Sequence, residues 1–249
     1  MEAVKVSNLS VRFGGVCAVN DVCFGVQPGE RVAIIGPNGA GKTTLFNLIN
    51  GQLAATEGTI RFFDQDVTNM QVHDRAQMGI IRSFQLVSLF LNLSVYENAL
   101  LALHGNKPYR FRVFRSIYRY RDVSEQVERA LKSVNLWQKR NELVKNISYG
   151  EQRKLEIGLS LAYEPRLLML DEPSNGLTAG ECQDIIRIIN GLDRNITVIM
   201  VAHDMELVFR VAERIIVLHY GQVIADASPS EIRRDSRVRE IYMGLEGTA

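Results

Sequence analysis

The sequence has few cysteines, no excess of charge of either sign and no long apolar run. Its 249 residues include three cysteines, Cys17, Cys23 and Cys182, which are too few and too widely spaced for a disulfide framework or a zinc cluster. We expect them to be the reduced thiols of a cytosolic protein. With 29 Lys and Arg against 28 Asp and Glu, the net charge of +1 gives no support to a protein that binds nucleic acid through its overall charge.

The sequence also lacks a segment that would carry it into or across a membrane. No apolar run approaches the roughly 18 residues that cross a bilayer, and residues 1–10 contain no signal-peptide core. We therefore expect a soluble chain, with any membrane role exerted through a partner. Hydrophobic residues make up 46%, which is ordinary for a globular protein, and at about 150 residues per domain the length fits one large α/β unit.

The apolar patterns predict strands first, then helices, then an alternation of the two. Period-two alternation is typical of the first third, and helical periodicity of the middle third, where Ser94 and Glu97 have the spacing of a capping box. Alternating strands and helices in the last third favour a parallel sheet with helices on both faces. The predicted strands are 4–13, 22–26, 31–35, 59–63, 167–170, 197–201 and 215–218, and the predicted helices are 42–50, 94–102, 123–134, 148–162, 181–189 and 205–211.

Residues 36–43, Gly-Pro-Asn-Gly-Ala-Gly-Lys-Thr, match the phosphate-loop pattern G-x-x-x-x-G-K-[ST] between a buried strand and a helix. Glycines let successive N–H groups point at phosphate oxygens, and the helix N-terminus adds a favourable potential. Lys42 can then reach the β- and γ-phosphates, and Thr43 can offer its hydroxyl to Mg²⁺. The predicted ATP-binding residues here are Gly36, Pro37, Asn38, Gly39, Ala40, Gly41, Lys42, Thr43 and Thr44.

The apolar residues 167–170 are followed by two carboxylates, Asp171 and Glu172. A buried strand that ends in an acid beside a phosphate loop suits a Mg²⁺-directed Asp171. The adjacent Glu172 can accept a proton from the attacking water, or orient that water. Alone, this pattern would also fit a strand that ends in solvent-exposed acidic residues. The phosphate loop upstream favours a nucleotide site instead.

Three further motifs complete a resemblance to the nucleotide-binding subunit of an ATP-binding cassette (ABC) transporter. Residues 147–152, Ile-Ser-Tyr-Gly-Glu-Gln, stand where that family has its Leu-Ser-Gly-Gly-Gln signature, and Ser83-Phe84-Gln85 and Val201-Ala202-His203-Asp204 match its Q-loop and switch segments. The five motifs occur in order over essentially the whole chain. The resemblance implies an α/β P-loop NTPase (RecA-like) core with an N-terminal antiparallel β-subdomain and an inserted α-helical subdomain.

The resemblance also implies roles for single residues. Ser148 and Gly150 would contact the γ-phosphate, and Phe13 would stack on adenine. Tyr149 replaces the first glycine of the signature, and Thr178 stands in the D-loop where Asp is usual. The candidate catalytic residues are Lys42, Gln85, Glu172 and His203, and the candidate Mg²⁺ ligands are Thr43, Gln85 and Asp171.

As implied by the resemblance, residues 1–249 form a single ATPase domain. Residues 1–84 would hold the nucleotide-binding core with the β-subdomain, 85–160 the helical subdomain with the signature, and 161–249 the second part of the core. Two such subunits would pair head to tail, so that Ser148 of one completes the ATP site of the other. The further partners implied are integral membrane permease subunits and an extracytoplasmic solute-binding protein, with this chain peripheral on the cytoplasmic face of the inner membrane and no nucleic acid bound.

Three segments resemble ATPases of branched-chain and hydrophobic amino-acid importers, namely residues 81–90, 148–157 and 239–244, although Leu159 stands where those relatives usually carry Arg. A lipid or lipopolysaccharide export ATPase is the alternative within transport. A soluble ABC ATPase that remodels DNA or ribosomes is a further alternative, but such proteins carry long coiled-coil insertions or two cassettes, and this sequence has neither. The sequence does not identify the transported molecule, because that molecule touches other subunits.

Residues 107–121 combine six basic residues with five interleaved aromatic ones and contain no acid. Such a segment suits a solvated insertion in the helical subdomain, an anionic membrane surface or single-stranded nucleic acid.

Overall fold

The structure is a computed structural model that describes residues 1–83, 89–105 and 121–246. Its strands are β1 (Val4–Phe13), β2 (Val16–Val26), β3 (Arg31–Ile35), β4 (Glu57–Phe62), β5 (Gln65–Asp66), β6 (Ile80–Ser83), β7 (Leu167–Asp171), β8 (Thr197–Val201), β9 (Arg214–His219) and β10 (Gln222–Ala227). Its helices are α1 (Lys42–Asn50), α2 (Val72–Gln77), α3 (Val95–Gly105), α4 (Arg121–Ser133), α5 (Tyr149–Ala162), α6 (Ala179–Asn190), α7 (Met205–Val211), α8 (Pro229–Ile232) and α9 (Ser236–Glu246), with 3-10 turns η2 (Trp137–Lys139) and η3 (Val144–Asn146).

The larger sheet has the strand order β10-β9-β3-β8-β7-β6. The strands from β9 to β6 are parallel, and β10 returns antiparallel beside β9. Every residue of β3, β7 and β8 is buried, as expected for parallel strands covered on both faces. Successive side chains enter opposite cores, so that Ala33 and Ile35 face the helical layer while Val32 and Ile34 pack on the side of α1.

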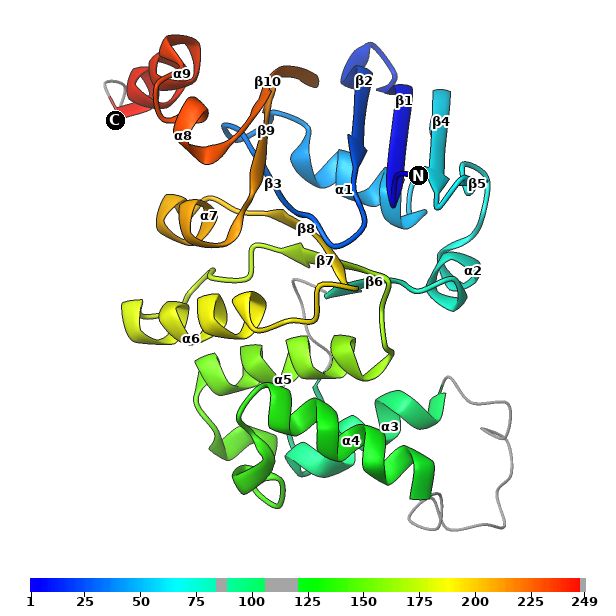
Figure 1. Cartoon of the computed structure of the whole chain (residues 1–249), viewed down its shortest axis with the longest axis vertical. Helices are drawn as coiled ribbons and strands as arrows, with labels where there is room; N and C mark the ends of the chain where they lie inside the picture. The colour runs from blue at the N-terminus through cyan, green and yellow to red at the C-terminus, as the bar shows by residue number, and fades with distance from the viewer. Residues whose placement is uncertain (84–88, 106–120, 247–249) are drawn as a thin grey trace.

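The smaller sheet is antiparallel, with the order β2-β1-β4-β5. Figure 1 shows α1 between this sheet and the larger one, and Leu45, Phe46 and Leu48 of α1 share one apolar cluster with residues of both sheets. The antiparallel β-subdomain and the parallel α/β core predicted from the sequence are therefore confirmed.

The middle of the chain supplies a layer of helices on the other face of the larger sheet, where α3, α4 and α5 pack on one another (Figure 1). The predicted capping box opens α3, because Ser94 Oγ accepts from the backbone nitrogen of Glu97 and Glu97 Oε2 accepts from that of Ser94. This placement agrees with a helical insertion, and the subdomain boundaries at residues 84 and 160 stay a prediction.

The sequence patterns did not predict β5, β6, β10, α2, α8 or α9. Most of these elements are too short to show the hydrophobic period of a strand or of a helix. Strand β10 is half-exposed along its length and therefore shows no clear alternation of buried and exposed residues. The strand predicted to end at Phe63 ends at Phe62, because Phe63 adopts a left-handed φ of 43°. Gly51 ends α1 as predicted, with a φ of 83°.

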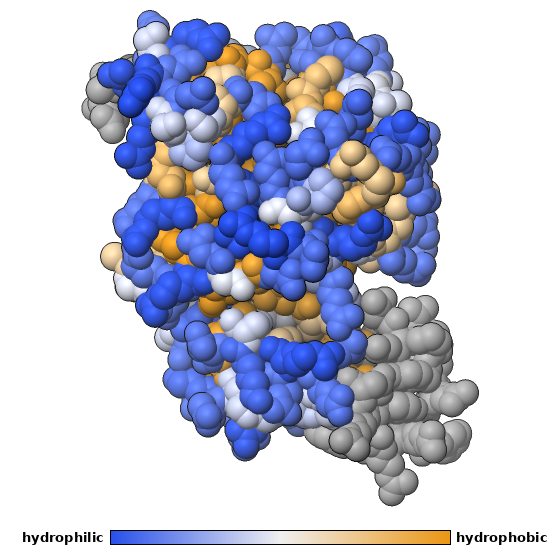
Figure 2. All heavy atoms as spheres, viewed as in Figure 1, coloured by the Kyte–Doolittle hydropathy of each residue, from blue (hydrophilic) through white to orange (hydrophobic). Residues whose placement is uncertain are grey.

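Hydrophilic residues cover most of the face seen in Figure 2, and hydrophobic residues show in smaller patches among them. In the ranges that the structure describes, no helix has the length and apolarity to span a bilayer. Gln85 and residues 107–120 of the basic–aromatic segment lie outside the described residues.

Candidate functional site

The phosphate loop joins the end of β3 to the start of α1. Gly41 precedes α1 with a φ of 100°, and a Cβ there would lie 2.4 Å from the carbonyl oxygen of Ala18. At Gly36 a Cβ would lie 2.2 Å from the carbonyl oxygen of Leu218. The loop is therefore pressed against β2 and β9, and only glycine fits these two positions. No side chain caps α1, so its first N–H groups remain available to an anion.

Lys42 folds back over the loop that precedes it. Its Nζ donates to the carbonyl oxygens of Gly36 at 2.8 Å and Pro37 at 2.9 Å. Burial lowers the pKa of Lys42, and the charge of Glu172 opposes that shift. The ammonium thus lies within electrostatic reach of the Glu172 carboxylate, which follows β7.

Asp171 ends β7 and is fully buried. Its Oδ2 pairs with Arg82, whereas its Oδ1 is buried without a hydrogen-bond partner. An unpaired carboxylate oxygen fits a hard cation such as Mg²⁺ or a water bound to it. In the described part of the chain no three His, Cys, Asp or Glu side chains form a metal cluster.

Glu172 and His203 face each other from the segments that follow the neighbouring strands β7 and β8. His203 Nε2 lies 2.9 Å from Glu172 Oε1, and Asn175 Nδ2 donates to Glu172 Oε2 at 3.3 Å. Glu172 has a left-handed φ of 45°, and its backbone nitrogen donates to the carbonyl of Val201. The backbone of Glu172 thus leaves the extended conformation of β7 while it stays bonded to β8, and both of its carboxylate oxygens have a partner.

The topology explains why these groups meet. Strands β3, β8 and β7 are neighbours, and Lys42, His203 and the Asp171–Glu172 pair all follow or end their strands at the carboxyl edge of the sheet. In open parallel sheets, ligands bind at this edge.

Arg153 on α5 binds the backbone of the turn that follows β7. The sequence patterns did not predict this role of Arg153. Its guanidinium donates to the carbonyl oxygens of Asp171 and Glu172, both at 2.8 Å, and of Pro173 at 3.3 Å. It also pairs with Glu156, whose pKa rises to about 7 because burial outweighs the effect of the arginine. The helix that begins with the signature thus holds the backbone of the two β7 carboxylates.

Ser148 is the N-cap of α5 and forms a capping box with Glu151. Its hydroxyl and the backbone nitrogen of Gly150 also donate to Glu181 Oε1, at 3.3 and 3.2 Å. In the described residues no hydrogen bond joins Ser148 or Gly150 to the phosphate loop, and α5 lies on the opposite face of the sheet from α1 (Figure 1). One chain does not bring its signature and its phosphate loop together.

Phe13 ends β1 and is 51% exposed, so its ring is accessible to a ligand. A small pocket of about 160 Å³ adjoins the phosphate loop, lined by Pro37, Asn38, Gly39, Ala40, His219, Tyr220 and Ile241.

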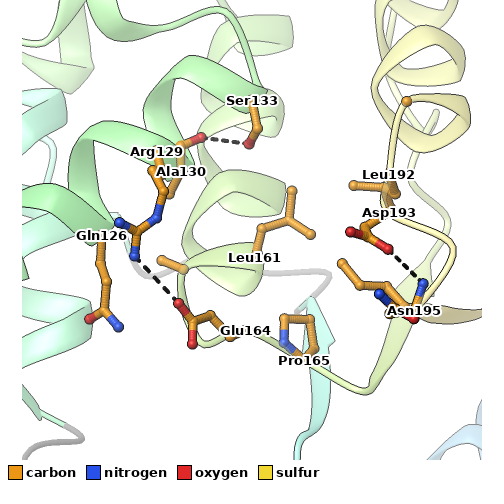
Figure 3. A pocket seen from close by; sticks show the side chains of 13 residues that line it. Gln126, Arg129, Ala130, Ser133, Leu161, Glu164, Pro165, Leu192, Asp193 and Asn195 are labelled. Carbon is orange, nitrogen blue, oxygen red and sulfur yellow. Dashed lines mark hydrogen bonds and ion pairs between the residues drawn. The ribbon is translucent and has the colours of Figure 1, made fainter.

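A larger cavity of about 450 Å³ contains none of the predicted site residues. It lies between α4, the end of α5 and the segment between α6 and β8 (Figure 3). Arg129 and Glu164 form an ion pair of 3.5 Å at its wall. Its remaining lining is largely apolar, and it is a gap between the helical layer and the core.

Comparisons with known proteins identify the family. Residues 19–175 match the family model described as ABC transporter, and residues 222–247 match the one described as branched-chain amino acid ATP-binding cassette transporter. The high-affinity branched-chain amino acid transport ATP-binding proteins BraF of Pseudomonas aeruginosa and LivG of Escherichia coli K12 are each 38% identical, with 97% of both chains covered. The lipopolysaccharide export system ATP-binding protein LptB of Haemophilus influenzae is 31% identical, with 98% of both chains covered.

Solved structures agree with these relatives. The ADP conformation of MJ1267, an ATP-binding cassette of an ABC transporter, superposes with a TM-score of 0.87 at 30% identity, covering 98% of this chain and 99% of that one. The dimeric cassette MJ0796, bound to ADP and Pi in a post-hydrolysis state, has a TM-score of 0.72 at 26% identity, covering 91% and 98%. The chain belongs to the ATP-binding, ATP-hydrolysing subunits of ABC transporters.

Proposed function

We propose that this chain powers the import of branched-chain amino acids, as one ATPase subunit of a membrane transporter. The observation that carries this proposal is the match of residues 222–247 to the model described as branched-chain amino acid ATP-binding cassette transporter, in addition to the general cassette match. The similarity to BraF and LivG over nearly the whole chain supports it.

At the nucleotide, we assign the phosphates to residues 36–44 and the adenine to Phe13. Lys42 supplies positive charge to the phosphates, and Glu172 takes the proton of the attacking water, oriented by His203. Thr43, Gln85 and Asp171 would hold Mg²⁺, which when bound neutralises charge on the phosphate oxygens. The unpaired Oδ1 of Asp171 and the 2.9 Å contact between Glu172 and His203 support these assignments.

The working unit in this proposal is a head-to-tail pair of subunits. The signature residues Ser148 and Gly150 lie away from the phosphate loop of their own chain, and they complete the ATP site of the partner. ATP then stabilises the closed pair, and its hydrolysis removes the contacts that favour closure. The structure of the cassette MJ0796, a dimer bound to ADP and Pi, supports a paired working unit.

Membrane coupling follows from the same proposal. We assign the chain to the cytoplasmic face of the inner membrane, bound to permease subunits near Gln85, with an extracytoplasmic solute-binding protein delivering the amino acid. The single-domain division at residues 84 and 160 belongs to this proposal as well.

Uptake measurements test the substrate. A strain that lacks this chain should take up radiolabelled leucine, isoleucine and valine more slowly, and the wild-type chain should restore uptake whereas Glu172→Gln should not. Normal uptake together with loss of lipopolysaccharide from the cell surface would instead favour export, the second candidate, which the 31% identity to LptB supports.

A further inference from the structure

Arg82 lies next to Asp171 because β6 and β7 are parallel neighbours. In their register Arg82 is opposite Met169 and Ser83 is opposite Leu170, so the side chain of Arg82 can reach the end of β7. Its Nη2 forms an ion pair with Asp171 Oδ2, and the two side chains are only 7% and 0% exposed. Removing either partner from such a buried pair leaves an uncompensated charge.

Contacts from α1 and the residues after it fix the guanidinium in place. Arg82 Nη1 donates to Asn47 Oδ1 at 2.6 Å and to Gln52 Oε1 at 2.7 Å. The guanidinium carbon lies 5.5 Å from the centre of the Phe46 ring. Since α1 starts at Lys42, Arg82 joins the helix of the phosphate loop to the strand that ends in Asp171.

Arg82 and Asp171 pair through one nitrogen and one carboxylate oxygen only, in the part of the chain that the structure describes. Asp171 Oδ1 and Arg82 Nε are both buried without a hydrogen-bond partner. An arginine–carboxylate pair is often bidentate, with two parallel hydrogen bonds, and that arrangement would satisfy both atoms. Here Asn47 and Gln52 hold the other side of the guanidinium, and one carboxylate oxygen is kept apart from it.

We propose that Arg82 is a positioning residue for the metal-directed carboxylate. It holds Asp171 by Oδ2 and so presents Oδ1 to the Mg²⁺ of the bound nucleotide. The proposal rests on the metal-directed role assigned to Asp171 above. A residue that orients a metal ligand affects the metal requirement more than it affects nucleotide binding without metal.

The test measures binding of the fluorescent, non-hydrolysable nucleotide mant-AMPPNP to the full-length chain, in EDTA and over a Mg²⁺ titration. Arg82→Met should bind the analogue in EDTA as the wild type does, while its half-saturating Mg²⁺ concentration rises about tenfold. Arg82→Lys keeps a charge but loses the fork geometry, so it should fall between the two.

Arg75→Met is the matched control. Arg75 is also a buried arginine next to α1, but it donates to the carbonyls of Leu48 and Ile49 and does not contact Asp171. This variant should melt at a lower temperature with an unchanged Mg²⁺ requirement. Gln52→Ala removes an exposed partner of Arg82. It should raise the Mg²⁺ requirement in the same direction as Arg82→Met but by a smaller factor, and it keeps the proposal testable if Arg82→Met does not fold.

Three outcomes would overturn the proposal. The first is an Arg82→Met half-saturation equal to or below that of the wild type, and the second is an equal loss of binding with and without Mg²⁺. The third is a shift in Arg75→Met as large as that in Arg82→Met. Asp171→Asn separates this inference from the proposed function, because an unchanged Mg²⁺ requirement in that variant would refute the role of Asp171 itself.

Discussion

Glu181 Oε1 lies 3.2 Å from the backbone nitrogen of Gly150 and accepts its hydrogen bond. The same carboxylate serves two helices, since Oε1 also accepts from Ser148 at the start of α5 while Oε2 accepts from Thr178 at the start of α6. A Cβ at Gly150 would lie 2.3 Å from Glu181 Oε1, so a larger residue there would displace this carboxylate. The donors assigned to the partner's γ-phosphate are therefore already occupied by an anion of the same chain.

Glu181→Ala should shift ATP-dependent dimerisation to lower ATP concentrations, because Ser148 and Gly150 no longer have a competing carboxylate. Light scattering in a Glu172→Gln background measures this shift. Thr178→Ala is the control, since it removes a capping partner of α6 and leaves Glu181 beside α5. Equal ATP dependence in both variants would show that the carboxylate does not compete.

Glu172→Gln should keep ATP binding and lose between about 10²- and 10⁴-fold in turnover, because the amide cannot take a proton from water. The amide oxygen can still accept from His203, so the variant should fold normally. Steady-state phosphate release and equilibrium ATP binding are the measurements. Hydrolysis at the wild-type rate would exclude Glu172 as the base.

The phosphate loop, the β7 carboxylates and the switch histidine could be predicted from sequence because each combines a local pattern with the end of a predicted strand. Lys42, Asp171 and His203 follow buried strands, and parallel topology then brings them to one edge. Arg82, Arg153 and Glu181 escaped such reasoning, because their partners are distant in the chain and their roles depend on packing between elements. The spacing from Thr178 to Glu181 fits a capping box and could have drawn attention to Glu181, but it does not reveal the bond to Gly150.

Lys42→Ala should weaken ATP binding by at least about tenfold, because a charged hydrogen bond to phosphate is lost. Lys42→Arg should not restore it, since a planar fork does not fit a loop in which the ammonium lies 2.8 Å from the carbonyl of Gly36. Equilibrium binding of ATP checks both variants. Unchanged affinity in Lys42→Ala would contradict the assignment of the phosphate loop.

Glu156→Gln should make stability less dependent on pH. Burial raises the pKa of Glu156 from 4.5 to about 7 in the folded chain, so the folded state binds more protons than the unfolded state between those values. The contribution of Glu156 to stability is therefore lost as the pH rises from about 4.5 to 7. Urea unfolding at several pH values should show a steeper decline in the wild type than in the variant, and parallel declines would refute the shift.

Ser148→Arg should prevent dimerisation while leaving ATP binding intact. The substitution places bulk and charge at the N-terminus of α5, away from the chain's own phosphate loop. The variant should bind ATP as a monomer, yet neither dimerise with ATP nor hydrolyse it. Light scattering of the Ser148→Arg, Glu172→Gln protein with ATP is the decisive measurement, with Glu172→Gln alone as the control.

A mixture of two variants tests the composite site, in which the phosphate loop of one subunit faces the signature of its partner. When Lys42→Ala chains pair with Ser148→Arg chains, both defects fall on one composite site and the other site keeps an intact lysine and an intact serine. ATPase activity should return in the mixture if the two sites fire independently, and strict coupling between the sites would suppress it. Normal ATP-dependent dimerisation of the Ser148→Arg protein would refute the proposed contact across the dimer, and Ser148 would then be only the N-cap of α5.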